Sequence, residues 1–305
     1  MWVQFEDIRN EIIKMIDKKM ESSTVIKKKA YALSVYFKIK PIFIDDDDIL
    51  AGHVGGDGNL DMLPYPVKDI NLKLLSDKND LMCLAQHMEN LEKEGFFGSI
   101  LGVHVAAAYD KLITEGISYK IKLLEEKYKC SIHSTNEEFY ESMLILMKSF
   151  QQLILRYSKL AEEKYKNSGN INLKNIAEAC GWIAFNPPRN LFESVQLLLI
   201  THECVVSEAG SGSISFGRLD QYLYPYYKKD IDEGVLTYKQ AQKIISALWY
   251  KISELELSWQ NVTIGGIDAN GNDMCNDLTV MCMDASMEIR GDQPQLSLRV
   301  SKNMP

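Results

Sequence analysis

Residues 210–227, which read GSGSISFGRLDQYLYPYY, combine serine hydroxyls, an arginine, an aspartate and a cluster of tyrosines. Side chains of these types can bind a phosphate, form a turn before a helix, or line a reaction chamber. The phosphate-binding interpretation fails on spacing, because Gly210, Gly212 and Gly217 fit neither G-x-G-x-x-G nor G-x-x-x-x-G-K-[ST]. A phosphate loop also follows a strand, whereas an apolar helix is expected before these glycines. The segment is therefore not predicted to bind a nucleotide.

Metal sites are also not predicted. The segment DANGNDMCNDLT has its glycine at the fourth position and Thr279 in place of the final glutamate, so it is no EF-hand. Cys130 with His133, and His202 with Cys204, are isolated pairs without the further ligands of a closed zinc site. The aspartates at 45–48 are expected to form a solvated turn.

Arg218 and Asp220 lie two positions apart, next to small residues and a long apolar segment. Charges in such a setting are expected to be partly buried, and a buried charge needs a partner. We therefore expect a structural ion pair between Arg218 and Asp220 that fixes a chain reversal.

Hydrophobic periodicity predicts a mainly helical α/β protein with a few late strands. Capping boxes are expected at Ser134 with Glu137 and at Thr237 with Gln240. The predicted helices cover about 5–20, 25–38, 79–93, 104–129, 134–166, 173–181, 189–207, 237–256 and 277–289, and the predicted strands cover 262–264 and 296–300, with a strand-like run at 42–44.

The chain has 305 residues and a net charge of −8, with 46% hydrophobic and 25% charged residues. These values are typical of a globular protein, and the negative charge disfavours nucleic acid and anionic membranes as partners. No apolar run is long enough to span a bilayer. Six scattered cysteines without a CxxC pair are expected to be reduced, so we expect a cytoplasmic protein.

Several segments together resemble one family. They are GSGSISFGRLDQYLYPYYKKDIDEGVLT, NPPRNLFESVQLLLITHE, NVTIGGIDANGNDMCNDLTVMCMDA, QPQLSLRV, KPIFIDDDDILAGHVGG and GVHVAAAYDKLITEGI. In this order and spacing the chain resembles the glycyl radical enzymes of the pyruvate formate-lyase-like superfamily, and it is closer to the dehydratase and decarboxylase branches than to pyruvate formate-lyase (formate C-acetyltransferase) itself. The resemblance covers essentially the whole sequence.

The resemblance implies the N-terminal part of a ten-stranded α/β barrel. It also implies anaerobic radical chemistry, in which a glycyl radical near the C-terminus takes a hydrogen atom from a cysteine and the resulting thiyl radical attacks the substrate. Complete members are expected to be homodimers and to need a radical S-adenosylmethionine activating enzyme. A buried barrel protects such radicals from water and oxygen.

The two radical loops of the family, G-C-x-E and R-V-x-G-Y, do not occur in these 305 residues. The similar RVSKN segment has Lys302 at the position of the radical glycine and no tyrosine after it. We therefore expect residues 1–305 to be a single incomplete domain, without catalytic residues or a bound cofactor of its own. Its expected partner is the missing C-terminal half or a second subunit that carries it.

Two substrate-pocket candidates follow from the resemblance. A His-Ser pair that binds substrate hydroxyls in the diol dehydratases corresponds to Gly212 and Ser213, so the serine is retained and the histidine is lost. His104 corresponds to the histidine of the family's G-H segment, which is expected here at the start of a helix. The alternative hypothesis is a noncatalytic helical binding or scaffold protein derived from the same fold.

Overall fold

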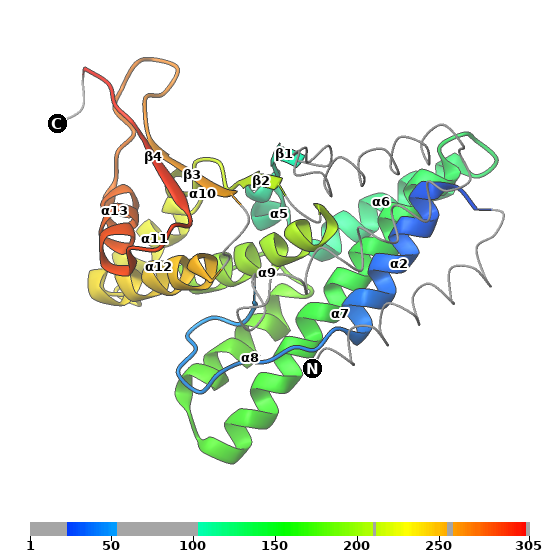
Figure 1. The fold of residues 1–305 in the computed structure, drawn as a ribbon, viewed down its shortest axis with the longest axis horizontal. Helices are drawn as coiled ribbons and strands as arrows, with labels where there is room; N and C mark the ends of the chain where they lie inside the picture. The colour runs from blue at the N-terminus through cyan, green and yellow to red at the C-terminus, as the bar shows by residue number, and fades with distance from the viewer. Residues whose placement is uncertain (1–22, 54–102, 210–211, 255–258, 303–305) are drawn as a thin grey trace, which may run out of the picture.

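The structure is a computed structural model that describes residues 23–53, 103–209, 212–254 and 259–302 (Figure 1). The predicted helices over 5–20 and 79–93 lie outside these ranges. The described helices are α2 (Val25–Ile39), α5 (Tyr109–Glu115), α6 (Ile117–Ser131), α7 (Glu137–Ser168), α8 (Ile171–Ile183), α9 (Leu191–Ala209), α10 (Leu219–Tyr222), α11 (Tyr224–Asp232), α12 (Tyr238–Ser253) and α13 (Asp277–Ile289). The described strands are β1 (Val103–Ala106), β2 (Gly212–Ser215), β3 (Trp259–Gly265) and β4 (Gln295–Arg299).

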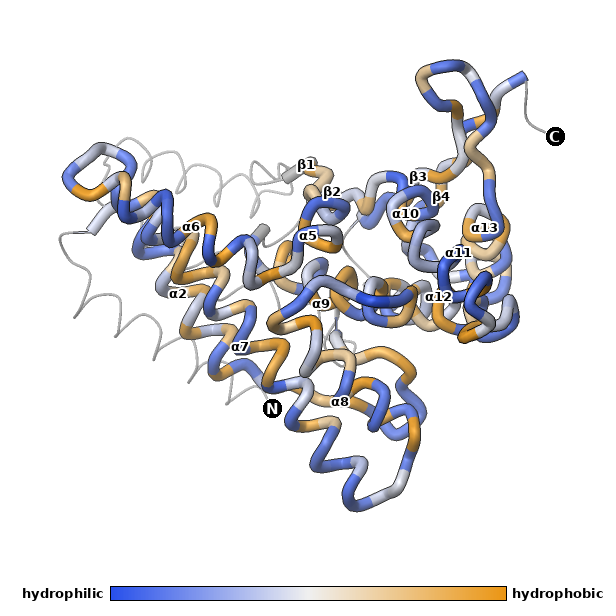
Figure 2. The backbone as a smooth tube through the Cα atoms, turned by 180° about the vertical axis from the view of Figure 1, so that it is seen from behind, coloured by the Kyte–Doolittle hydropathy of each residue, from blue (hydrophilic) through white to orange (hydrophobic). Residues whose placement is uncertain are grey.

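The longest helix, α7, packs against α2, α6 and α8. Hydrophobic and hydrophilic residues alternate along its tube, as expected for a helix with one buried face (Figure 2). The capping box predicted for its start is wrong in detail. Ser134 Oγ accepts from the Asn136 amide at 3.2 Å, and Glu137 Oε2 accepts from the His133 amide at 2.6 Å. The box predicted at Thr237 and Gln240 is confirmed at the start of α12.

The helix α9 runs through the middle of the molecule and contacts α5, α8, α11, α12 and β2 (Figure 1). Apolar side chains occur on all its sides, and Leu197 through Ile200 are fully buried. A helix that is apolar all round needs neighbours on every side, which is why α9 is central. Among the described helices, none is both long and apolar enough to cross a membrane.

The strands form one parallel sheet in the order β1-β2-β3-β4. The strands predicted at 262–264 and 296–300 are confirmed as β3 and β4, with shifted ends. The helix predicted from His104 is wrong at its start, because residues 103–106 pair with β2 and helix begins only at Tyr109. The strand-like run at 42–44 forms no strand.

A buried ion pair joins the segment after α2 to α9. Lys40 Nζ contacts Glu203 Oε1, and the Tyr157 hydroxyl of α7 donates to both oxygens of Glu203 at 3.0 and 3.1 Å. Burial alone would lower the pKa of Lys40, but the Glu203 carboxylate raises it above the ordinary value. The side chain of Glu203 is 0% exposed, so this charge depends entirely on its protein partners.

A buried histidine lies between α9 and the sheet. His202 Nδ1 is 2.8 Å from the Tyr109 hydroxyl, and the imidazole stacks on Phe216 with ring centroids 3.9 Å apart. Burial lowers the pKa of His202 to about 3, although an interaction with Gln260 acts in the opposite direction. The imidazole is therefore neutral in the folded protein at ordinary pH.

The Glu203→Gln variant tests the buried pair. Without the carboxylate, the Lys40 ammonium loses its counterion inside the protein, so we expect the free energy of unfolding to fall by about 3–5 kcal/mol. Urea denaturation measures the change. The control is Glu162→Gln, which removes the exposed pair with Lys166 and should leave the free energy of unfolding nearly unchanged. A loss below about 1 kcal/mol for Glu203→Gln would contradict this account.

The His202→Gln variant tests the neutral histidine. Below its ordinary pKa of 6.5 the unfolded chain binds a proton at position 202 that the folded protein does not bind until about pH 3. This group therefore reduces stability as pH falls from 6.5 towards 3, by about 1.4 kcal/mol per pH unit. We expect His202→Gln to be less stable at pH 7.5 but to lose less stability between pH 6.5 and 5. An unchanged pH slope in His202→Gln would refute the prediction.

Candidate polar wall of the sheet

The parallel sheet has one apolar and one polar face. In β3 the side chains of Gln260, Val262 and Ile264 are buried, while Asn261 and Thr263 alternate with them and are half-buried. Helices α9, α10 and α13 contact the strands β2 and β3. Parallel sheets ordinarily carry apolar residues on both faces, so hydroxyl and amide groups on one face point to a binding surface.

The strand registers place further polar residues on the same face of the sheet. Ser213 pairs with Trp259, Ser215 with Asn261, Asn261 with Gln295 and Thr263 with Ser297. Paired residues in a sheet share a face. The polar wall is defined here by the polar residues of this face, Ser213, Ser215, Asn261, Thr263, Gln295 and Ser297, and the exposed Trp259 shares the face with them.

The two pocket candidates lie at neighbouring register positions. His104 of β1 pairs directly with Ser213 of β2, although they are far apart in the sequence. The sheet therefore places His104 at a position that shares the face of Ser213. Ser213 is half-buried, as a residue that reaches a ligand from a wall should be. Their role in substrate binding stays a prediction.

Asn261 connects the centre of the polar wall and was missed by the sequence analysis. Its Nδ2 donates to Ser213 Oγ, and its carbonyl oxygen accepts from Ser215 Oγ at 3.3 Å and from the Phe216 amide at 2.8 Å. The predicted strand began only at Val262. The alternation of Gln260, Val262 and Ile264 with Asn261 and Thr263 was the available signal.

The predicted ion pair between Arg218 and Asp220 is wrong. Asp220 Oδ2 instead accepts from the Gly265 amide at 2.8 Å and from the Thr279 hydroxyl at 2.6 Å. Asp220 Oδ1 and the Nε and Nη2 atoms of Arg218 are buried without a hydrogen-bond partner. Asp220 thereby ties α10 to the end of β3 and to α13.

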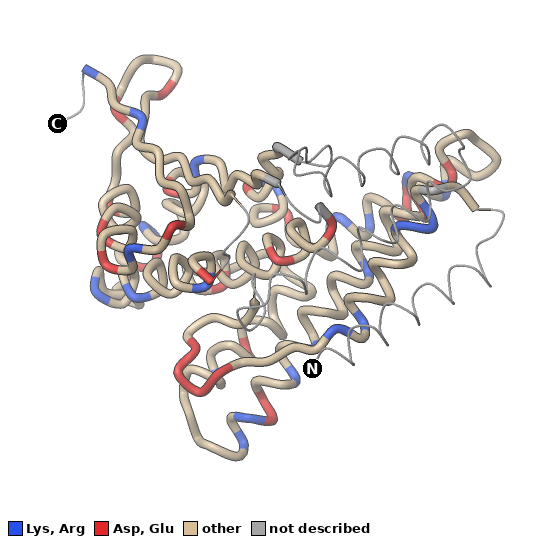
Figure 3. The backbone as a smooth tube through the Cα atoms, viewed as in Figure 1, with Lys and Arg blue, Asp and Glu red and all other residues tan. Residues whose placement is uncertain are grey.

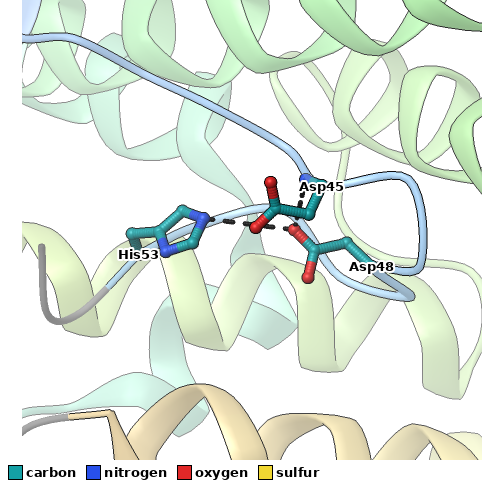
Figure 4. A group of neighbouring side chains, drawn as sticks. All are labelled: Asp45, Asp48 and His53. Carbon is teal, nitrogen blue, oxygen red and sulfur yellow. Dashed lines mark hydrogen bonds and ion pairs between the residues drawn. The ribbon is translucent and has the colours of Figure 1, made fainter. Parts of the chain in front are cut away.

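The acidic turn after α2 was predicted to be solvated, but it is solvated only in part. Figure 3 shows it as a continuous acidic segment, and Asp48 within it is only 8% exposed. Asp48 Oδ2 accepts from the Asp45 amide at 2.9 Å and lies 4.0 Å from His53 Nε2 (Figure 4). The other oxygen of Asp48 contacts Lys251 Nζ of α12 at 2.5 Å.

The group Asp45, Asp48 and His53 has ligand atoms close enough together to hold a metal ion. The Lys251 ammonium, however, already balances the buried charge of Asp48. The geometry therefore supports an ion pair that fastens this turn to α12, and nothing further points to a metal there.

The described cysteines lie outside the polar wall. Cys130, Cys180, Cys204 and Cys282 lie on helices, and Cys275 lies in the segment between β3 and α13. Burial raises the pKa of the Cys180, Cys204 and Cys282 thiols. A buried thiol of this kind packs as a small apolar side chain.

Comparison with known proteins assigns a family to this fold. The description "Pyruvate formate lyase-like" matches residues 84–305. The isethionate sulfite-lyase of Oleidesulfovibrio alaskensis is 30% identical over 269 residues, which cover 78% of this chain and 32% of that protein. The (2S)-3-sulfopropanediol dehydratase of Klebsiella oxytoca is 28% identical over 192 residues, covering 57% of this chain and 23% of that protein.

Solved structures agree with the sequence relatives. A glycyl radical enzyme from Archaeoglobus fulgidus is similar with a TM-score of 0.79 and 26% identity, over 98% of this chain and 46% of that one. The chain thus spans about a third of the first relative and less than half of this solved structure. The predicted fold class, a mainly helical part of the glycyl radical enzyme barrel, is confirmed. The chain belongs to the pyruvate formate lyase-like family of glycyl radical enzymes.

Proposed function

We propose that this chain forms one wall of the substrate chamber in a glycyl radical enzyme of the dehydratase or lyase type. The observation that carries the proposal is the polar wall, a row of hydroxyl and amide groups on one face of a parallel sheet whose other face packs on helices. Family membership supplies the kind of chemistry, and the sheet supplies a surface that such chemistry requires.

We propose that the parts of the reaction are divided between this chain and another polypeptide segment. Another polypeptide segment supplies the thiyl cysteine and the radical glycine, and a radical S-adenosylmethionine enzyme generates the radical. The thiyl sulfur takes a hydrogen atom from a substrate carbon, so an S–H bond forms and the carbon becomes a radical. The polar wall would hold the substrate during this step, and the chain alone would be inactive.

The proposed substrate is a small organic molecule with at least one hydroxyl group. Ser213 and Asn261 offer a hydroxyl and an amide at the centre of the polar wall, and such groups position a substrate hydroxyl. The relatives named above act on isethionate and on sulfopropanediol, both small hydroxylated sulfonates. Gly212, where diol dehydratases carry a histidine, favours a different hydroxyl-binding arrangement from theirs.

An activation experiment tests whether this chain can carry a glycyl radical without the two radical loops. The chain is incubated anaerobically with a radical S-adenosylmethionine activating enzyme and examined by electron paramagnetic resonance. We expect no glycyl doublet from this chain alone, and a doublet once a polypeptide with the G-C-x-E and R-V-x-G-Y loops is added. A doublet from the chain alone would refute the proposed division, and no assembly with any such polypeptide would favour the scaffold alternative.

The Ser213→Val variant tests the polar wall in the assembled enzyme. Valine removes the hydroxyl while keeping a strand-forming side chain, so a substrate hydroxyl loses its partner. We expect kcat/KM to fall about tenfold or more, with the assembly intact by sedimentation. The control, Ser246→Ala, removes a hydroxyl that bonds to Glu288 on the surface and should leave the rate unchanged. Equal rates for Ser213→Val and the parent would overturn the assignment.

A further inference from the structure

Arg218, a half-buried residue just beyond β2, has two guanidinium nitrogens without a partner. Its Nε and Nη2 atoms are buried, and neither has a hydrogen-bond partner. A guanidinium stays protonated in proteins, so it cannot avoid the cost of burial by losing its charge. These two N–H groups favour an anionic partner, and the described residues do not provide one.

The two unsatisfied atoms form one edge of the guanidinium. Their N–H bonds run parallel and match two oxygens of a single oxyanion. Arg189 shows this arrangement in the same chain, since its Nε and Nη2 both donate to the Glu193 carboxylate. Arg218 therefore presents the edge that Arg189 uses, but without the carboxylate.

The described residues near Arg218 do not fill this edge. Asp220 directs Oδ2 to the Gly265 amide and the Thr279 hydroxyl, and no ion pair joins it to Arg218. A Cβ placed on Gly217, the preceding residue, would meet no atom within 4 Å, so the backbone here borders open space. The Gly217 amide donates to Ser215 Oγ at 3.1 Å, which links this turn to the polar wall.

We propose that the Nε–Nη2 edge of Arg218 is a binding site for an oxyanion with two available oxygens, such as a carboxylate. The site lies past the carboxyl end of β2, the edge at which parallel α/β sheets bind ligands. The oxyanion is either a free small molecule or a carboxylate side chain of another polypeptide segment. Both sources offer the same two-oxygen chemistry.

A titration followed by nuclear magnetic resonance tests the site. The probe is sodium acetate, compared with sodium chloride at equal ionic strength, and the signal is the Arg218 Nε–H resonance assigned with Arg218→Lys. We expect a saturable shift with acetate and none with chloride. The Arg189 Nε–H resonance is the internal control and should not move, because Glu193 already occupies that edge. No acetate-dependent shift at Arg218 would overturn the proposal.

Thermal denaturation with acetate gives a second measurement. A ligand that binds only the folded state raises the melting temperature, so acetate should stabilise the parent chain. We expect Arg218→Gln to weaken acetate binding about tenfold or more and to abolish this rise. Arg189→Gln is the matched control and should retain it. A rise of equal size in Arg218→Gln would place acetate elsewhere and refute the proposal.

The same acetate titration in the assembled enzyme distinguishes a free oxyanion from a carboxylate of the added polypeptide. Only this experiment rests on the proposed function. If Arg218 still responds to acetate after assembly, the natural ligand is a free oxyanion. If assembly itself shifts the Arg218 resonance and abolishes the acetate response, a carboxylate of the added polypeptide fills the edge. Failure to assemble would count against the proposed function and leave the acetate result on the isolated chain unaffected.

Discussion

The burial of α9 is the constraint on which the rest of the structure depends. This helix has apolar side chains on all sides, so α5, α8, α11, α12 and β2 must each cover part of it. Two of its polar side chains find partners within the same core, Glu203 in Lys40 and Tyr157, and His202 Nδ1 in the Tyr109 hydroxyl. The two halves of the molecule, the α7 bundle and the sheet, meet through this helix (Figure 1).

The polar wall depends on α9 indirectly. Ile214 is buried behind β2, and His202 of α9 stacks on Phe216 just after that strand. With the apolar side of the strand fixed, the alternation of a β-strand turns Ser213 and Ser215 to the other side. A one-residue slip in register would bury both hydroxyls and expose Ile214, so the packing behind the sheet determines the chemistry in front of it.

Much of the fold could be predicted from local sequence, and the site could be predicted only in part. The cap at Thr237 and Gln240 was predictable because its partners lie three positions apart. The strand at His104 was not, because only pairing with residues 212–215 makes that short segment a strand. The partner of Asp220 was missed for the same reason, since Gly265 and Thr279 are distant in sequence. Ser213 was found through the family resemblance, whereas Asn261 required the strand register.

The parallel register between β1 and β2 also has a consequence for biosynthesis. Val103 pairs with Gly212, so more than a third of the chain separates the two partners. A ribosome adds about 5–20 residues per second, so β1 spends on the order of several seconds outside the ribosome before β2 exists. During that interval its backbone groups are free to pair with other chains. The helices made in between, α5 to α9, can fold locally before β2 arrives.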